Sequence, residues 1–339
     1  EICSVFFDLR KAFDSVPHGP LLDRLLSYSL NPSLLAWIHG YLAGRTQTVV
    51  VDGDQSTSLP VISGVPQGSV LGPLLFIIYV NDLTSVISPY SKVSMFADDI
   101  ALYRTITAAA DYLQLQSDIS AINFWVQDNH LSFNVGKCCT MFVTRKSNLH
   151  SNSPPPLFLG NTALTQVDSV KYLGITLTTD LSWSLHISTI NAKTRKLLGL
   201  LYRRFYFCST PALLTLYTSF IRPHLEYASQ VWDPYLRKDI KLLHSTQTFA
   251  LRVATKDWSC SSEILHSQLN FPTLSDRRHV AKLSHLYKIV HKIEDFQSPP
   301  LTFKPLCYKT RNSHSLTLSP IPSHSSQFYF SFFFFFITL

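Results

Sequence analysis

The sequence predicts an α+β fold, in which a split βαβ antiparallel sheet with helices on one face is followed by an all-α basic region. Two patterns lead to this prediction. Up to about residue 146, strand-like and helix-like segments follow one another in the order β-α-β-β-α-β, with one extra hairpin. Beyond residue 180, apolar residues recur at helical spacing among many lysines and arginines.

The first segments are expected to form a strand, a helix and a second strand. Residues 2–7 have an apolar strand pattern that ends at Asp8. Leucines at positions 21, 22, 25 and 26 share one face of the helix that follows, and residues 48–52 have the pattern of a strand. Because the chain begins inside an apolar strand with no turn before it, we interpret its N-terminus as truncated.

An acidic pair occupies the next predicted hairpin. Pro66-Gln67-Gly68-Ser69 precedes an apolar helix that runs toward Leu83. Residues 93–103 have the pattern of two short strands bent around Asp98-Asp99. The two aspartates are therefore expected at the tip of a hairpin.

The first predicted domain covers residues 1–146 and ends with a helix over 112–129 and a strand over 140–143. Residues 147–180 are assigned to a Ser/Asn/Pro linker followed by a strand-rich hairpin.

Residues 181–296 are expected to form a second, helical domain, with helices over 185–207, 211–229, 236–254 and 274–292. The tail, residues 297–339, is rich in proline and serine and ends in a run of phenylalanines, so we expect it to be disordered or non-native.

The net charge of +7 is unevenly distributed. Residues 1–180 carry 10 Lys and Arg against 14 Asp and Glu, whereas residues 181–292 carry 16 against 6. The basic half is consistent with a polyanionic partner or with an ordinary solvated surface. No signal-peptide pattern is present, the longest apolar run is too short to span a bilayer, and the cysteines lack zinc-ligand spacing, so we predict no membrane association and no zinc.

Asp8 and the Asp98-Asp99 pair are expected to converge on one edge of the sheet. Carboxylates brought close together repel one another unless a cation neutralises them, and such clusters commonly hold hard divalent ions. Two ions about 4 Å apart activate an attacking hydroxyl and stabilise a leaving oxygen in phosphoryl transfer. Taken alone, Asp98-Asp99 is better explained as a polar turn between strands.

Three motifs in the expected order resemble those of reverse transcriptases. Phe6-Phe7-Asp8-Leu9-Arg10-Lys11-Ala12-Phe13-Asp14 is similar to motif A, Ser63-Gly64-Val65-Pro66-Gln67-Gly68-Ser69 to motif B, and Phe96-Ala97-Asp98-Asp99 to motif C. Two downstream segments, Arg222-Pro223-His224-Leu225-Glu226-Tyr227-Ala228 and Leu274-Ser275-Asp276-Arg277-Arg278, resemble jockey- and CR1-like elements. The chain thus resembles the reverse transcriptase of a non-LTR (LINE-type) retrotransposon.

This resemblance implies a right-hand polymerase palm, a helical thumb and post-thumb region, and largely missing fingers. Asp8 and Asp98 would be metal ligands together with the Leu9 carbonyl, and Asp99 would assist beside them. The implied cofactor is a pair of Mg²⁺ ions, with Mn²⁺ as an alternative. Phe13 would lie under the incoming sugar and favour deoxynucleotides; without its motif, it would be interpreted as a core aromatic.

Other motifs imply further roles. Gln67 and Gly68 would approach the nucleotide or the template, although an ordinary turn explains them as well. Lys137, near a segment similar to motif D, would donate a proton to the departing pyrophosphate. The alternative is that Lys137 is only a surface charge. Lys171-Tyr172-Leu173-Gly174 resembles motif E, so Tyr172, Leu173 and Gly174 would form the primer grip, or else a simple strand end.

The basic helices would follow the phosphates of a template–primer duplex. The residues assigned to this contact are Arg195, Lys196, Arg203, Arg204, Lys238 and Lys241. The aromatic residues among them, Tyr202, Phe205 and Tyr206, are explained either as stacking platforms for bases or as core.

The sequence therefore predicts an RNA-directed DNA polymerase core that uses an RNA template, a DNA primer and deoxynucleoside triphosphates. The alternative is a catalytically inactive, nucleic-acid-binding remnant of such an element, and a third reading is a metal-dependent nuclease. From the family alone we expect a nuclear and cytoplasmic location, and the sequence does not indicate an oligomeric state.

Overall fold

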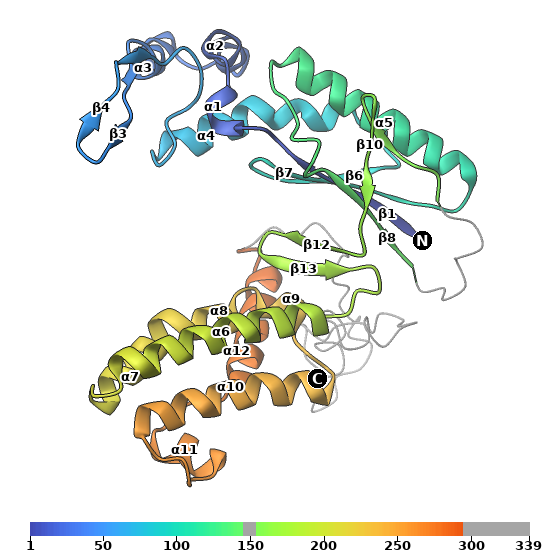
Figure 1. The fold of residues 1–339 in the computed structure, drawn as a ribbon. Coiled ribbons are helices and arrows are strands. Elements are labelled where there is room, and N and C mark those ends of the chain that lie inside the picture. The colour runs from blue at the N-terminus through green and yellow to red at the C-terminus, as the bar shows by residue number, and fades with distance from the viewer. Residues whose placement is uncertain (145–153, 294–339) are drawn as a thin grey trace, which may run out of the picture. The chain divides into compact units, whose positions relative to one another are not determined.

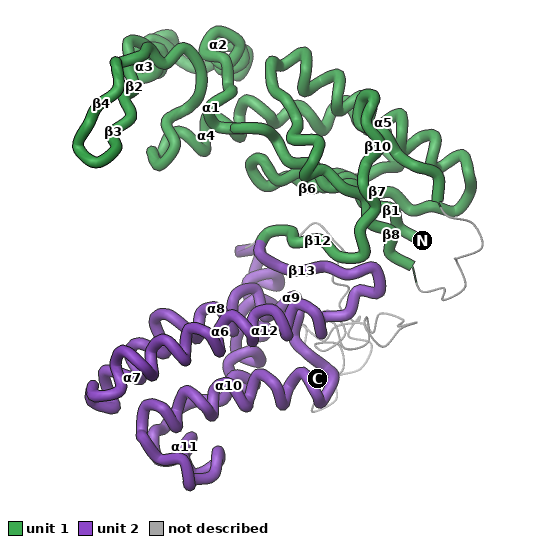
Figure 2. The backbone as a smooth tube through the Cα atoms, viewed as in Figure 1, with its two compact units in different colours: residues 1–173 green, residues 174–339 purple. Residues whose placement is uncertain are grey.

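A computed structural model describes residues 1–144 and 154–293 (Figure 1). The chain divides into two compact units between Leu173 and Gly174 (Figure 2). This division falls inside the segment 147–180 that the sequence assigned to a linker and hairpin. The predicted tail over 297–339 lies outside the described residues.

The first unit is built on a five-stranded sheet with β1 at its centre. Its strands, in spatial order, are β11 (Thr165–Gln166), β8 (Cys139–Val143), β1 (Ile2–Asp8), β7 (Asp99–Thr105) and β6 (Lys92–Phe96). The neighbouring pairs from β8 to β6 are antiparallel, as predicted. At the edge beyond β8 the sheet is mixed, because the short strand β11 pairs with β8 in parallel.

Two helices cover the same side of this sheet, α4 (Leu71–Val80) and α5 (Ala109–Asp128) (Figure 1). In α5, Leu115, Ile119 and Ile122 are completely buried, so the three- and four-residue spacing seen in the sequence does mark the core face. The helix begins where the Asp111 carboxylate accepts hydrogen bonds from the amides of Thr107 and Ala108. A short 3-10 helix, η1 (Asn81–Val86), follows α4.

Between β1 and α4 the chain forms three helices and two small hairpins. They are α1 (Ala12–Ser15), α2 (His18–Ser27) and α3 (Pro32–Leu42), then β2 (Thr46–Gln47) paired with β5 (Leu59–Pro60), and β3 (Val50–Val51) paired with β4 (Asp54–Gln55).

The strand predicted over 48–52 is therefore only a hairpin arm and does not join the main sheet. Asp52 and Gly53 both have positive φ, the type I′ geometry that closes a two-residue hairpin. The valines of β3 are more than half exposed, so this arm contributes little to the core.

Two further hairpins lead to the second unit. The first pairs β9 (Phe158–Leu159) with β10 (Thr162–Ala163), and the second consists of β12 (Ser169–Tyr172) and β13 (Ile175–Thr178). The β12–β13 hairpin contains the chain division, so Tyr172 belongs to the first unit and Gly174 to the second.

The second unit is helical. Its elements are α6 (Ser184–Phe205), α7 (Thr210–Leu216), the π-helical turn η3 (Tyr217–Ile221), α8 (Arg222–Glu226), α9 (Ser229–Trp232), α10 (Arg237–Thr255), α11 (Ser262–Gln268) and α12 (Leu274–Val290). Its core includes Ile187, Leu225, Trp232 and Leu243, all fully buried. Among the described helices, none combines the length and apolarity that crossing a membrane requires.

The helix predicted over 211–229 is present as α7, η3 and α8 in direct succession from Thr210 to Glu226, but it contains a π-helical turn and ends three residues earlier than predicted. Pro223 has no amide hydrogen to donate, and α8 begins beside it. Ala228 then adopts a left-handed conformation with φ of 51°, which interrupts the helix before α9.

Candidate active site

Asp8 and Asp99 lie directly opposite each other on adjacent antiparallel strands. Asp8 is the last residue of β1 and Asp99 the first of β7, and the two are register partners. Asp98 precedes Asp99 in the two-residue turn that joins β6 to β7, whose closing partners are Phe96 and Asp99. The structure thus brings the three predicted aspartates to one edge of the sheet.

The turn that carries Asp98 is strained. Ala97, its first residue, has a φ of 53°, a region that residues with a Cβ rarely adopt. Such a conformation costs about 1 kcal/mol or more and persists only where the surrounding structure enforces it. Here the flanking β6–β7 pairing over five register partners enforces it.

The electrostatics of the edge follow from this convergence. Partial burial raises the pKa of Asp99, and the negative charges of Asp98 and Asp8 raise it further. The charges of both other carboxylates therefore disfavour the ionised form of Asp99. A cation placed among the three would relieve this repulsion.

Lys137 already supplies one positive charge to this edge. Its ammonium lies 3.6 Å from the Asp8 carboxylate, and its side chain is 68% exposed against 36% for Asp8. The ion pair thus joins Lys137, the residue predicted from motif D, to Asp8, the predicted metal ligand of motif A.

The loop that carries Lys137 is bonded to the end of β1 by its backbone. The Asn134 amide donates to the Asp8 carbonyl at 2.8 Å, and the Arg10 amide donates to the Ser132 carbonyl at 2.8 Å. The Asp8 amide in turn donates to the Cys138 sulfur at 3.4 Å. Burial raises the pKa of the Cys138 thiol to about 11, so this sulfur remains protonated near neutral pH.

Hard carboxylate oxygens are suitable ligands for divalent ions, so the donor chemistry of this edge fits such a cation. Over residues 1–144 and 154–293, however, no three His, Cys, Asp or Glu side chains are gathered closely enough to hold a metal ion. The Leu9 side chain is buried in the core, and Leu9 forms an isolated bridge with Phe133.

Phe13 is partly buried and held by its neighbours. Its ring stacks on Phe76 of α4, with 4.7 Å between centroids and 26° between planes. Its carbonyl accepts a hydrogen bond of 2.8 Å from the Val65 amide. The predicted sugar-contacting ring is therefore packed against the helix that follows motif B.

The start of motif B is bonded to the segment after motif A at several points. The Gly64 amide donates to the Val16 carbonyl at 2.7 Å, and the His18 imidazole Nε2 lies 2.9 Å from the Gly64 carbonyl. Gly64 has a φ of 92°, and an added Cβ would lie 2.8 Å from the Asp14 Cα. Only glycine fits here.

Gln67 and Gly68 are exposed on the loop before α4. Gly68 has a φ of 85° but open space around it, so its requirement is conformational and not steric. The Ser69 hydroxyl accepts a hydrogen bond from the Gly72 amide at 2.9 Å and thereby closes the loop onto α4.

The predicted primer-grip residues form a tight turn. Leu173 and Gly174 have φ values of 45° and 80°, the pattern of a type I′ hairpin turn. Tyr172 packs against Phe6 with 5.5 Å between ring centroids. Burial raises the pKa of Tyr172, and the charge of Asp99 adds to this effect, which places the phenol within electrostatic reach of the acidic edge.

The predicted phosphate contacts of the second unit differ in their availability. Arg195 is engaged within the unit, because its guanidinium donates to Thr246 and Ser245, both at 3.1 Å. The other five are exposed, Lys196, Arg203 and Arg204 on α6 and Lys238 and Lys241 on α10.

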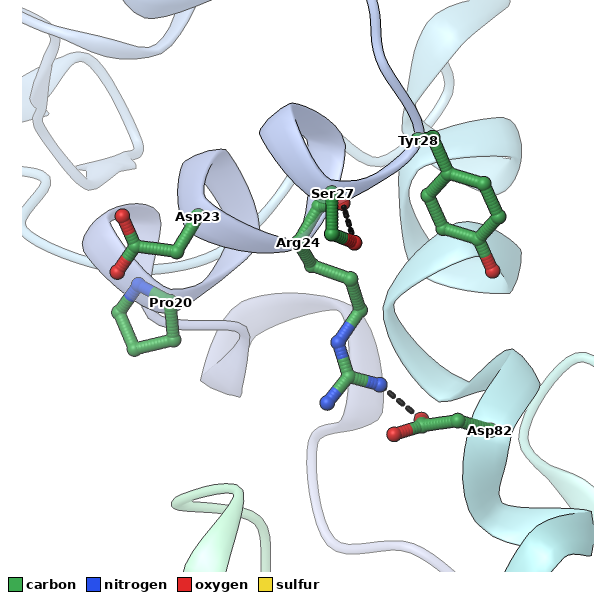
Figure 3. Close-up of a pocket in the computed structure, with 6 residues that line it drawn as sticks. All are labelled: Pro20, Asp23, Arg24, Ser27, Tyr28 and Asp82. Carbon is green, nitrogen blue, oxygen red and sulfur yellow. Dashed lines mark hydrogen bonds and ion pairs between the residues drawn. The ribbon is translucent and has the colours of Figure 1, made fainter.

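A pocket of about 420 Å³ in the first unit was not anticipated from the sequence (Figure 3). Figure 3 shows Arg24 of α2 reaching an ion pair with Asp82. The Arg24 guanidinium also donates to the Asn129 side chain at 2.8 Å and lies over the rings of Tyr79 and Trp125. These contacts join α2, α4, η1 and the end of α5, so Arg24 has a structural role.

Two connections at the site were missed by the sequence reasoning, the Lys137–Asp8 ion pair and the His18–Gly64 hydrogen bond. Both join residues far apart in the chain, and no spacing pattern indicated either contact. The adjacent residues Pro17 and Ser63 form an isolated bridge, which explains why His18 meets Gly64.

The fold and this edge define an α+β protein whose central sheet presents three carboxylates at one end. The chain belongs to the reverse transcriptase (RNA-dependent DNA polymerase) family, whose model matches residues 1–177. This confirms the resemblance predicted from the motifs, and with it the palm-like fold class. Enzymes of this family generally use divalent metal ions and an RNA template.

Two relatives from fruit flies extend the similarity beyond the matched domain. A probable RNA-directed DNA polymerase from transposon X-element of Drosophila melanogaster is 31% identical over 287 residues, which cover 81% of this chain and 31% of the relative. The RNA-directed DNA polymerase from mobile element jockey of Drosophila funebris is 30% identical over 295 residues, covering 83% and 32%. The chain thus spans about a third of the length of these relatives.

Among solved structures, apo telomerase from Candida Tropicalis shows a weak similarity. The TM-score is 0.45 at 11% sequence identity, over 79% of this chain and 43% of that chain.

Proposed function

We propose that this chain is the RNA-directed DNA polymerase core of a non-LTR retrotransposon and extends a DNA 3′ end on an RNA template. One observation carries the proposal. Asp8 faces Asp99 across β1 and β7, and Asp98 stands beside them in the turn, within a chain of the reverse transcriptase family. Both motif-bearing strands are central in the sheet, which gives these acids a rigid support.

The proposed cofactor is a pair of Mg²⁺ ions, with Mn²⁺ as an alternative, held by Asp8, Asp98 and the Leu9 carbonyl with Asp99 beside them. The oxygen-only donor set and the raised pKa of Asp99 support a divalent ion at this edge. When bound, such ions activate the primer 3′-hydroxyl and stabilise the leaving phosphate oxygen.

Lys137 has two proposed functions at this edge. In the free protein its ammonium balances the charge of Asp8 from 3.6 Å. Because the side chain is mostly exposed, it is free to turn toward a triphosphate and to donate a proton to the departing pyrophosphate.

Phe13 is proposed to select the sugar. Its contacts with Phe76 and Val65 limit the positions that the ring can adopt. A ring held in one place excludes a 2′-hydroxyl by steric overlap and so favours deoxynucleotides. Gln67 and Gly68, exposed on the neighbouring loop, are proposed to approach the nucleotide or the template strand.

The β12–β13 turn, with Tyr172, Leu173 and Gly174, is proposed to position the primer backbone. Lys196, Arg203, Arg204, Lys238 and Lys241 are proposed to bind nucleic-acid phosphates, supported by their exposure. Arg195 is proposed to organise α6 against α10, given its bonds to Thr246 and Ser245.

A primer-extension assay on poly(rA)/oligo(dT) with Mg²⁺ or Mn²⁺ tests the proposal, with Asp98→Ala as the variant. We expect extension by the unaltered chain and a loss of at least about a thousandfold in the variant, the scale at which removal of a catalytic group acts. Binding of the primer–template without any Asp98-dependent extension would instead identify an inactive remnant. Asp98-dependent cleavage without synthesis would identify a nuclease.

A further inference from the structure

Five aromatic side chains gather at one end of the second unit. Tyr202, Phe205, Tyr206 and Phe207 lie at the C-terminal end of α6, and Trp258 lies in the turn after α10. Figure 1 shows these two helix ends at the same end of the unit. We call these residues the aromatic cluster.

The aromatic cluster is not core. Phe207 is 94% exposed, Trp258 47%, Phe205 41% and Tyr202 36%. The sequence left open whether the aromatics of α6 are buried or present their faces to a ligand, and these exposures favour the second explanation. Burial of a ring in the core would reduce such fractions nearly to zero.

The rings hold one another in defined orientations. Tyr202 meets Tyr206 edge to face at 5.2 Å and Trp258 at 6.2 Å. Trp258 in turn packs against Phe249 at 5.6 Å, over which the Arg195 guanidinium lies. The base of the cluster is therefore anchored to α6 and α10, while its outer rings remain accessible.

Cations surround the aromatic cluster. Arg203 and Arg204 are exposed between its rings on α6, and the Lys256 ammonium lies 5.1 Å from the centre of the Tyr206 ring. The neighbouring acid, Asp257, accepts hydrogen bonds from the amides of Ser259 and Cys260. Three cations beside one engaged carboxylate make this surface suitable for a polyanion.

We propose that the aromatic cluster binds single-stranded nucleic acid, with unpaired bases stacking on its rings and phosphates contacting Arg203, Arg204 and Lys256. Accessible rings interspersed with cations are the combination that binds unpaired strands without sequence readout. A duplex presents phosphates but hides its base faces, so it makes use of the cations alone.

This site lies outside the acidic edge and uses none of its residues. It rests on the proposed function only in that the substrate of both is nucleic acid. The aromatic cluster would bind an unpaired strand, in addition to the phosphate contacts that we assign to the duplex.

Fluorescence anisotropy with the full chain tests the inference. The probes are labelled RNA and DNA of about 15 nucleotides without self-pairing, and a blunt duplex of the same sequence. The variant is Phe207→Leu, which keeps an apolar side chain but removes the aromatic face. Because Phe207 is 94% exposed, the substitution leaves the core intact, and thermal unfolding checks this. Phe124→Leu on α5, where Phe124 is 70% exposed, is the matched control.

We expect Phe207→Leu to weaken binding of the unpaired strand about fivefold or more, and Phe207→Tyr to restore it. Duplex binding should stay unchanged in these variants, and Phe124→Leu should bind like the unaltered chain. Trp258→Leu combined with Phe207→Leu should lower the affinity further.

Equal binding of the unpaired strand by the unaltered chain and both the single and double variants would overturn the inference. So would binding of phosphatidylserine vesicles that depends on Phe207 while strand binding does not, because that pattern identifies a membrane-facing surface. The outcome is separable from the polymerase proposal, since the Asp98→Ala chain should bind the unpaired strand normally whether or not the unaltered chain synthesises DNA.

Discussion

The ammonium of Lys137 lies 3.6 Å from the carboxylate of Asp8. A lysine on the loop before β8 thus supplies counter-charge to the strand end where Asp8 faces Asp99. In the free protein this pair occupies one of the carboxylates that a divalent ion would need. The ion pair and the metal are therefore expected to compete for Asp8.

Replacing Lys137 with methionine should strengthen divalent-ion binding. The methionine keeps a long side chain but removes the charge that competes for Asp8. Exposed ion pairs contribute about 0–1 kcal/mol, so the gain should not exceed about fivefold. The Mg²⁺ concentration that gives half of the maximal rise in melting temperature measures it.

Lys137→Arg is the control for this experiment and should leave the Mg²⁺ dependence nearly unchanged. If Lys137→Met bound Mg²⁺ no better, or more weakly, the two cations would not share Asp8. The same variant should slow primer extension if Lys137 protonates the pyrophosphate, and this loss should remain at saturating Mg²⁺.

Asp99→Asn should stabilise the metal-free protein at neutral pH. Burial and the charges of Asp98 and Asp8 raise the pKa of Asp99 in the folded state above its ordinary value of 3.8. The folded state thus holds the proton more tightly, and the unfolding free energy falls as the pH rises from 3.8 through the raised value.

The asparagine removes this penalty, so we expect a melting temperature about 1–2 °C higher at pH 7 without divalent ions. The gain should shrink as the pH is lowered through the raised folded-state pKa and disappear below 3.8, where the carboxyl becomes protonated in both states. Thermal unfolding in the presence of a chelator across this pH range measures the gain in melting temperature. A gain that grows at low pH would contradict a raised pKa of Asp99 in the folded state.

Gly64→Ala and Gly68→Ala form a matched pair for the motif B loop. Both glycines have positive φ, but only at Gly64 would the new Cβ meet backbone, 2.8 Å from the Asp14 Cα. We expect a loss of at least about 2 kcal/mol of unfolding free energy at Gly64 and about 1 kcal/mol at Gly68. Urea unfolding measures both, and equal losses would mean that the Gly64 contact has no energetic effect.

Phe13→Ala should relax sugar selection. The ratio of ribonucleotide to deoxynucleotide incorporation, measured on one enzyme preparation, should rise on the order of tenfold, because the ring no longer fills the space beside the sugar. The ratio is insensitive to the fraction of folded protein, which matters because Phe13 also stacks on Phe76. Phe13→Tyr should keep the original selection, and an unchanged ratio in Phe13→Ala would show that the ring is only core.

Much of the palm-like unit could be predicted because its signals are local. The apolar run before Asp8, the acidic pair at a hairpin tip and the helical spacing of Leu115, Ile119 and Ile122 each lie within one element. The structure has β1, the β6–β7 hairpin and α5 where these patterns indicated.

Other features depend on contacts between distant segments. The His18 imidazole meets Gly64 across 46 positions in the sequence, and β11 adds to β8 only after the β9–β10 hairpin has turned the chain back. Neither arrangement leaves a periodic signal in the sequence. In the second unit, the regular apolar spacing on both sides of Pro223 predicts one uniform helix. It does not indicate the π-helical turn that precedes α8 in the structure.

Binding of Mn²⁺ measured by electron paramagnetic resonance tests the central claim most directly, which is that Asp8, Asp98 and Asp99 form the metal site of a polymerase. The comparison uses the unaltered chain, Asp8→Asn, Asp98→Asn and, as a control, Asp52→Asn in the exposed β3–β4 turn. We predict that the unaltered chain and Asp52→Asn bind Mn²⁺ alike, and that Asp8→Asn and Asp98→Asn each bind at least about tenfold more weakly. Equal Mn²⁺ affinity in all four proteins would contradict the claim.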